Sequence, residues 1–138
     1  MDQKLAVLAK VPLLSGLGQK DLAEVAQLCD EVDVPAGYVL MREGTPGSEF
    51  FVILDGSVEI TSGGATLRTM GAGEFLGEIA LVDHGHRTAT ATTTTPARLL
   101  VLGTREFKSL LSAHPEIQGD VMLALAKRIR TTGTTPEE

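Results

Sequence analysis

The sequence has no tryptophan, a single cysteine and few aromatic residues, which make up 4% of the chain. Its apolar residues, 43% of the total, are therefore mostly Leu, Val, Ala and Ile, and the predicted core is aliphatic. The lone Cys29 excludes an internal disulfide and fits a reducing compartment. It follows Leu22, Val25 and Ala26 at helical spacing, so we expect a small buried hydrophobic residue there and not a nucleophile.

Long apolar runs are also absent. Runs such as residues 50–54 and 99–102 are far shorter than the ~20 residues that a transmembrane helix needs. The N-terminal stretch MDQKLAVLAKVP has an acid at its second position and no small-residue cleavage site after an apolar core of sufficient length. We therefore expect a cytoplasmic protein that has neither a membrane span nor a secretion signal.

Positive charge is scarce, because 12 Lys and Arg stand against 18 Asp and Glu, for a net charge of -6. Nucleic acid and anionic membranes both select basic surfaces, so neither is favoured as a partner. A chain of 138 residues has the size of one domain. It shows no internal repeat, and no helix pair after the predicted barrel resembles a DNA-reading helix-turn-helix.

Short runs of Val, Ile, Leu, Phe and Thr, each closed by Gly or Pro, indicate β-strands in the middle of the chain. Regularly spaced short strands favour a closed or double-sheet architecture, because such folds hide their strand edges. The predicted fold is mainly β, a jelly-roll barrel (double-stranded β-helix) with flanking helices. The single domain is expected to comprise a helical N-terminal part, a β-roll, C-terminal helices and a loose polar tail, at residues 1–31, 32–103, 104–131 and 132–138.

Three helices are predicted around the barrel. Residues 19–31 form an amphipathic segment, Thr104 is placed as the cap of a helix that ends near residue 112, and Pro115 lies in the first turn of a helix to about residue 130. An apolar stripe, with Met122 and Ala126 beside it, follows the last helix at Ile117, Val121, Leu125 and Ile129. This stripe would pack on its own barrel or on a second copy, so a homodimer stays open.

The segment GEIALVDHGHRTATA, residues 77–91, interrupts the barrel pattern. The glycines of GAGEFLG allow a sharp bend, and EIALV then predicts one helical turn that starts at Gly77 or Glu78. The first amides of such a turn lack helical partners, carry partial positive charge and bind anions. Arg87, ten positions after Gly77, adds a permanent cation whose planar fork suits phosphate.

Other features of this region fit a sugar and a ligand pocket. The carboxylate of Glu78 is an acceptor only, so its useful partners are Arg87 or hydroxyl groups such as those of a ribose. Residues 88–95, TATATTTT, predict a strand with a small-residue face that leaves room for a ligand. Amides and Arg for phosphate, together with Glu for a sugar hydroxyl, indicate a nucleotide.

These motifs resemble the cyclic nucleotide-binding domain family. The resemblance covers about residues 12–130 and rests on PAGYVLMREGTPGSEFFVILDGSVEI, on GAGEFLGEIAL and on RTATA. The turn glycines that match the family in order are Gly37, Gly44, Gly56 and Gly73. The resemblance implies helices at the N-terminus, an eight-stranded β-roll, a C-terminal hinge with a lid helix, and a phosphate-binding cassette at residues 77–91.

The resemblance also implies a role for each ligand residue. Arg87 would bind the exocyclic phosphate oxygens, Glu78 the ribose 2′-hydroxyl, and Ile60 would lie under the base. Main-chain amides along the sugar and phosphate would come from Gly77, Ile79, Ala80 and Thr88. Residues that would cover the base from the last helix are Leu125, Arg128 and Ile129.

The implied activity is that of a non-enzymatic sensor. Its ligand would be cAMP. cGMP is left open, because Thr88 stands at a family position where a hydroxyl group tends to favour the guanine base in eukaryotic members. No metal or other cofactor is implied, and the partner would be an effector protein or a further domain. Two residues depart from the family pattern: Leu76 stands where Phe is usual, and His86 stands where Pro often precedes the Arg, but neither removes a ligand contact.

Two other interpretations stay open. His84 and His86 lie at alternate positions with Glu78 upstream, similar to the metal face of cupin enzymes. The later Glu and third His of such enzymes are missing, since His114 falls on the predicted helices, so a solvated loop around Gly85 is preferred. Alternatively, the domain keeps the fold without the ligand and serves as a docking module.

Overall fold

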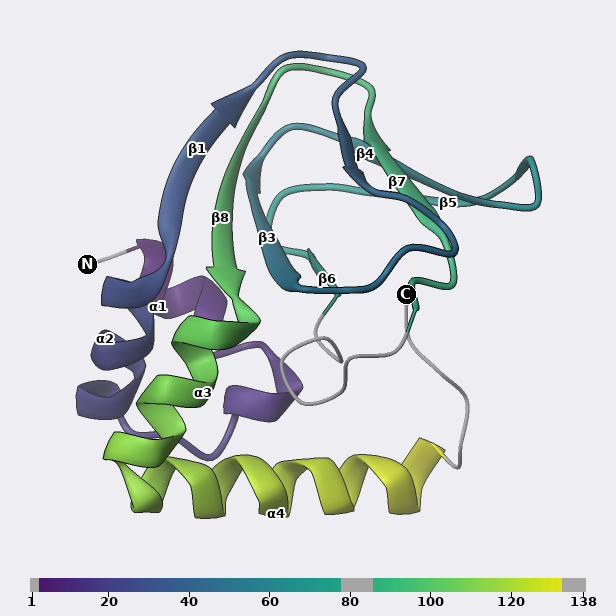
Figure 1. Ribbon diagram of the computed structural model, residues 1–138. Helices are drawn as coiled ribbons and strands as arrows, with labels where there is room; N and C mark the ends of the chain where they lie inside the picture. Colours follow the sequence, from purple (N-terminus) through teal and green to yellow (C-terminus); the bar gives the residue numbers. More distant parts are fainter. Residues whose placement is uncertain (1–2, 78–85, 133–138) are drawn as a thin grey trace.

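The computed structural model describes residues 3–77 and 86–132, with the backbone alone at Gln3, Leu125 and residues 127–132. Within these ranges, two four-stranded antiparallel sheets have the orders β1-β8-β3-β6 and β2-β7-β4-β5 (Figure 1). The strands are β1 (Asp30–Val34), β2 (Val39–Met41), β3 (Glu49–Asp55), β4 (Val58–Ser62), β5 (Ala65–Met70), β6 (Phe75–Leu76), β7 (Thr90–Thr93) and β8 (Ala97–Gly103). The predicted jelly-roll is confirmed, although its first strand begins before the predicted residue 32.

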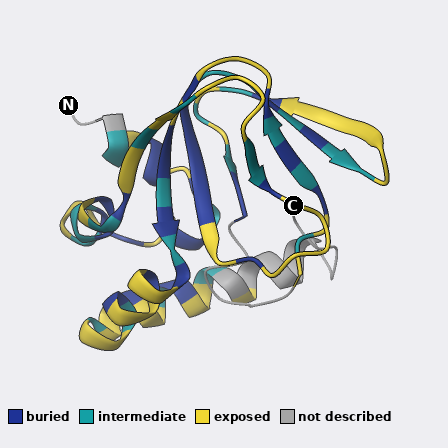
Figure 2. Cartoon of the chain, turned by 45° about the horizontal axis from the view of Figure 1, so that its top comes forward, coloured by how far each residue is buried: buried dark blue, intermediate teal, exposed yellow. Residues whose placement is uncertain are grey.

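Strand β3 explains why one apolar run in the sequence does not alternate with polar residues. Successive side chains of a strand point to opposite faces. Phe50, Val52 and Leu54 therefore belong to a core shared with the helices, whereas Phe51 and Ile53 belong to the core inside the roll. Both faces of β3 are buried (Figure 2), so both need apolar residues.

The core inside the roll draws side chains from both sheets, which therefore pack face to face. Ile53 and Leu99 come from the first sheet, and Val58, Ile60 and Ala91 come from the second. The turn that joins β3 to β4 depends on glycine: Gly56 has φ +110°, and a Cβ atom there would lie 2.7 Å from the Ala97 Cβ.

The helices gather on the outer face of the sheet that contains β3 and β8 (Figure 1). They are α1 (Gln3–Leu8), the 3₁₀ turn η1 (Pro12–Leu14), α2 (Gln19–Leu28), α3 (Thr104–Ala113) and α4 (Pro115–Thr132). Of the predicted stripe on α4, Ile117 and Val121 are buried against this layer, whereas Met122 is 58% exposed. None of the described helices is long and apolar enough to cross a membrane.

The start of α3 differs from the prediction that Thr104 caps it. The N-cap is Gly103, which is extended (φ −77°, ψ 148°) and is the last residue of β8, so Thr104 is already helical. The main-chain N–H of Thr104 donates to the Ser48 carbonyl at 3.0 Å, and the residue is buried. Strand β8 thus passes into α3 without a loop.

Cys29 is buried at the end of α2, as predicted. Its Sγ donates a weak hydrogen bond to the Val25 carbonyl at 3.5 Å. Burial raises the pKa of this thiol from 9.0 to about 11, with Lys4 opposing and Asp30 adding to the shift. A neutral thiol is a poor nucleophile, which agrees with a packing role.

The raised pKa predicts a specific loss of stability in alkaline solution. Between pH 9 and 11 the unfolded thiol loses its proton while the folded thiol keeps it, so rising pH favours the unfolded chain. We expect the free energy of unfolding of the wild-type chain to fall by about 1–3 kcal/mol more than that of Cys29→Ala across this window. Urea unfolding at stepped pH measures the difference, and parallel curves for the two proteins would contradict it.

Candidate functional site

Gly77 is the residue that follows β6, the edge strand of the sheet that contains β3 and β8. It is buried and has φ +79°, a left-handed conformation that glycine adopts readily. Because a right-handed helical turn cannot include such a residue, the prediction that the turn starts at Gly77 is wrong. The alternative start, Glu78, lies outside the described residues, as do Ile79, Ala80 and His84.

The guanidinium of Arg87 lies directly against Gly77. A Cβ atom on Gly77 would stand 2.6 Å from Arg87 Nη1 and 3.0 Å from the Glu49 carbonyl oxygen. Arg87 Nη2 donates a hydrogen bond to that same carbonyl, at the start of β3. Two of the predicted site residues, ten positions apart in the sequence, are thus brought together, and glycine at position 77 leaves the space that the guanidinium fills.

The main chain of Arg87 is held by the loop between β2 and β3. Its N–H donates to the Thr45 carbonyl at 2.7 Å, and its carbonyl accepts from the Gly44 N–H at 2.8 Å. One residue further on, the Thr88 carbonyl accepts from Ser62 Oγ at 3.2 Å, at the end of β4. The neighbouring His86 is exposed and pairs with Pro46 through an isolated β-bridge.

The guanidinium is a partly buried cation that lacks a carboxylate partner in the described part of the chain. None of the ion pairs among those residues includes Arg87. Burial lowers the pKa of the Arg87 guanidinium and the charge of Glu49 raises it, but an arginine stays protonated in proteins. A desolvated positive charge beside a glycine turn is an arrangement that an anionic ligand would stabilise.

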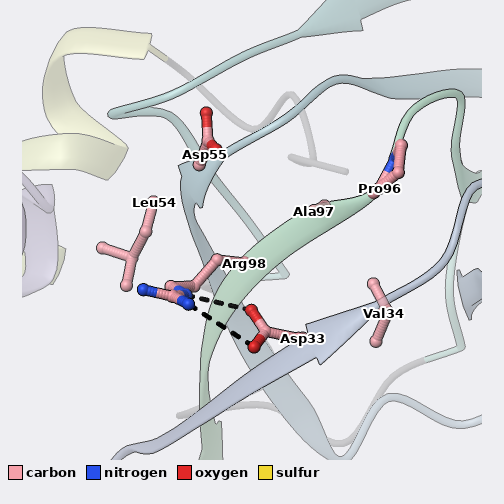
Figure 3. A pocket seen from close by; sticks show the side chains of 7 residues that line it. All are labelled: Asp33, Val34, Leu54, Asp55, Pro96, Ala97 and Arg98. Carbon is pink, nitrogen blue, oxygen red and sulfur yellow. Dashed lines mark hydrogen bonds and ion pairs between the residues drawn. The ribbon is translucent and has the colours of Figure 1, made fainter.

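Arg98 provides a contrast within the same fold. It lies with Asp33 and Asp55 in an open groove on the outer sheet face (Figure 3). Its Nε donates to Asp33 Oδ1 at 2.9 Å and pairs with Glu31 Oε2 at 3.6 Å. The hydrogen bond from Arg98 lowers the pKa of the Asp33 carboxyl. Because its charge is already balanced, Arg98 does not form a comparable anion site.

The predicted small-residue strand is present as β7. Ala89 and Ala91 are fully buried inside the roll, and Ala91 lies opposite Ile60 of β4. Ile60 is itself fully buried, and Thr88 is exposed. Ile60 and Ala91 thus lie inside the roll, whereas Thr88 lies at its surface. The predicted lid residues Leu125, Arg128 and Ile129 belong to α4, with side chains outside the described set.

Sequence reasoning missed two groups at the site: the Glu49 carbonyl, which accepts from the Arg87 guanidinium, and the Ser62 hydroxyl, which donates to the Thr88 carbonyl. A main-chain acceptor has no sequence signature, and Ser62 lies 26 positions before Thr88, the residue whose carbonyl it contacts. The metal interpretation gains no support from the described part of the chain, where no three His, Cys, Asp or Glu residues are grouped to hold an ion.

The family model for the cyclic nucleotide-binding domain matches residues 31–114, more than half of the chain. The chain belongs to this family. Among curated proteins, it is 31% identical over 131 residues to the CRP-like cAMP-activated global transcriptional regulator of Mycobacterium tuberculosis, covering 91% of this chain and 58% of the relative. A cyclic nucleotide-gated potassium channel of Mesorhizobium japonicum is 37% identical over 111 residues, which cover 80% of this chain and 31% of the channel. The chain thus spans little more than half of the first relative.

Solved structures agree with this assignment. The N-terminal domain of a transcriptional regulator from Streptomyces coelicolor A3(2) superposes with a TM-score of 0.84 at 34% identity and covers 91% of this chain and 92% of that domain. The regulatory domain of Toxoplasma gondii PKA with cAMP has a TM-score of 0.72 at 28% identity over 78% of this chain and 43% of its own. The predicted family and its β-roll are therefore confirmed.

Proposed function

We propose that the chain is a cAMP sensor that passes the binding event to an effector protein or domain. The observation that carries the proposal is Arg87, a partly buried cation seated against Gly77 without a carboxylate partner among the described residues. The names of two relatives, a cAMP-activated regulator and a regulatory domain solved with cAMP, support this ligand over cGMP.

In the proposed complex each residue has a distinct task. Arg87 binds the exocyclic phosphate oxygens, and the main-chain amides of Gly77, Ile79, Ala80 and Thr88 line the sugar and phosphate. Glu78 accepts from the ribose 2′-hydroxyl, and Ile60 lies under the base. Ile60 lies opposite the small Ala91 of β7 in the apolar core of the roll, which supports apolar surroundings at this position.

The proposed output is a rearrangement of α3 and α4. A ligand shifts such an equilibrium only if it binds the two arrangements with unequal affinity. A physical route supports the coupling: Arg87 Nη2 bonds to the Glu49 carbonyl, and the adjacent Ser48 carbonyl accepts the first amide of α3. Movement of Arg87 towards phosphate would therefore change how residues 106–111 of α3 pack. Leu125, Arg128 and Ile129 of α4 would then cover the base.

A calorimetric titration with cAMP and cGMP, with 5′-AMP as the open-ring control, tests the proposal. We expect heat and a raised melting temperature with cAMP and neither with 5′-AMP, because the proposed site takes a cyclic phosphate with one negative charge. A ligand at 100 times its Kd stabilises a fold by about 2.7 kcal/mol, which a thermal shift detects readily. A folded chain that gives no heat and no shift with either cyclic nucleotide up to millimolar concentration would contradict the proposal and favour a docking module.

A further inference from the structure

We propose that Glu43 is a positioning residue for the Arg87–Thr88 segment. It lies in the loop between β2 and β3, and its side chain reaches the tip of the β4–β5 hairpin, which projects from the roll (Figure 1). The inference rests on the proposed function, since the segment that Glu43 holds is the one proposed to grip the phosphate.

The carboxylate of Glu43 connects the β4–β5 hairpin to the loop between β2 and β3. Oε1 accepts from the Gly63 N–H at 3.0 Å, and Oε2 lies 3.3 Å from Ser62 Oγ. The same Ser62 hydroxyl lies 3.2 Å from the Thr88 carbonyl oxygen. The side chain of Glu43 is therefore one hydroxyl group away from the main chain that follows Arg87.

The main chain at Glu43 and Gly44 also bonds to the segment that contains Arg87 and Thr88. The Glu43 N–H donates to Thr90 Oγ1 at 2.9 Å, and the Gly44 N–H donates to the Arg87 carbonyl at 2.8 Å. The Arg87 carbonyl and the Thr88 N–H share one peptide plane, so the bond from Gly44 sets where that N–H points. Ser62 sets the next plane through the Thr88 carbonyl. Two successive peptide planes are thus oriented by Glu43 and its neighbours.

Counting protons predicts which substitutions keep this arrangement. The Ser62 hydroxyl has one proton and faces two acceptors, the Glu43 carboxylate and the Thr88 carbonyl. In Glu43→Gln the amide oxygen still accepts from the Gly63 N–H, while the amide nitrogen donates to Ser62 Oγ and leaves the Ser62 proton to Thr88. Glutamine therefore preserves the network, whereas alanine removes it.

Calorimetric titration of the full chain with cAMP tests the inference. We expect Glu43→Ala and Ser62→Ala each to weaken cAMP binding about three- to tenfold, and the double variant to lose no more than the larger single loss, because the residues act in one network. Glu43→Gln should stay within about twofold of the wild type. The matched control is Glu59→Ala, which removes a carboxylate that accepts from Thr66 Oγ1 at 3.0 Å within the same hairpin and should also stay within about twofold.

Amide chemical shifts of the unliganded chain give a second readout that does not depend on cAMP. The Ala89 N–H shares a peptide plane with the Thr88 carbonyl that Ser62 contacts, so its signal should move in Glu43→Ala and stay in place in Glu43→Gln and Glu59→Ala. If the wild type binds no cAMP, the proposed function fails, while this pattern of shifts still supports the positioning role. An unmoved Ala89 signal in Glu43→Ala, or a Gln variant that loses as much affinity as the Ala variant, would overturn the inference.

Discussion

Replacing Arg87 by alanine is expected to weaken cAMP binding by roughly tenfold to a few hundredfold. Charge-assisted hydrogen bonds contribute roughly 1.5–3 kcal/mol each, against about 0.3–1 kcal/mol for a helix dipole, and each 1.4 kcal/mol is about a factor of ten in Kd. The guanidinium is held beside Gly77 by its bond to the Glu49 carbonyl, so the proposed movement towards phosphate starts from an ordered side chain. Calorimetric titration of both proteins at one salt concentration measures the loss.

Two further variants separate this effect from a general loss of charge or of fold. Arg98→Ala removes an arginine that is paired with Asp33 on the outer sheet face, and it should bind cAMP as the wild type does. His86→Ala alters the exposed neighbour of Arg87 and should also have little effect. Equal losses in Arg87→Ala and His86→Ala would instead favour a metal site, and an Arg87→Ala variant with wild-type affinity would refute the proposed role of the cation.

Replacing Gly77 by alanine is expected to reduce both stability and cAMP affinity. At φ +79° an alanine is strained by about 1–2 kcal/mol, and its Cβ atom would stand 2.6 Å from Arg87 Nη1. The guanidinium must then move away from the turn, so we expect cAMP affinity to fall by at least about tenfold. Urea unfolding reports the strain, and calorimetric titration reports the displaced cation.

Gly37→Ala is the matched control for this pair of effects. Gly37 has φ +81°, almost the same backbone strain, but a Cβ atom there would meet nothing within 4 Å. It should therefore lose similar stability and keep its cAMP affinity. If Gly37→Ala lost affinity as Gly77→Ala does, the effect would come from weakened folding and not from contact with Arg87.

The fold was predictable because its signals are local. Glycine and proline closed each apolar run, and the positive φ angles at Gly37, Gly44 and Gly73 confirm that these positions need glycine. The run at residues 50–54 is predicted as a strand from its residue types. Its burial on both faces is not predicted, because it depends on helices that are distant in the sequence. The prediction that Thr104 caps α3 is wrong because threonine is a common N-cap residue, whereas the observed N-cap, Gly103, has no side chain that marks this role.

The candidate site was predictable only in its ionic part. Gly77 and Arg87 stand out by residue type and spacing, and the structure brings them together. The Glu49 carbonyl and the hydroxyl of Ser62 were not found, because any residue supplies the first and many surface serines resemble the second. The exposure of Met122 was also missed, since it lies just beside the stripe that begins with Ile117 and Val121.

Because β3 and β8 contribute to two cores at once, the roll and the helices form one folding unit. A roll separated from its helices would present Phe50, Val52, Leu54, Leu100 and Leu102 to water. A fusion or truncation that omits the C-terminal helices therefore risks aggregation through an uncovered sheet. For the same reason, the proposed motion of α3 and α4 would keep these side chains buried only if α3 slides along β8 and does not detach from it.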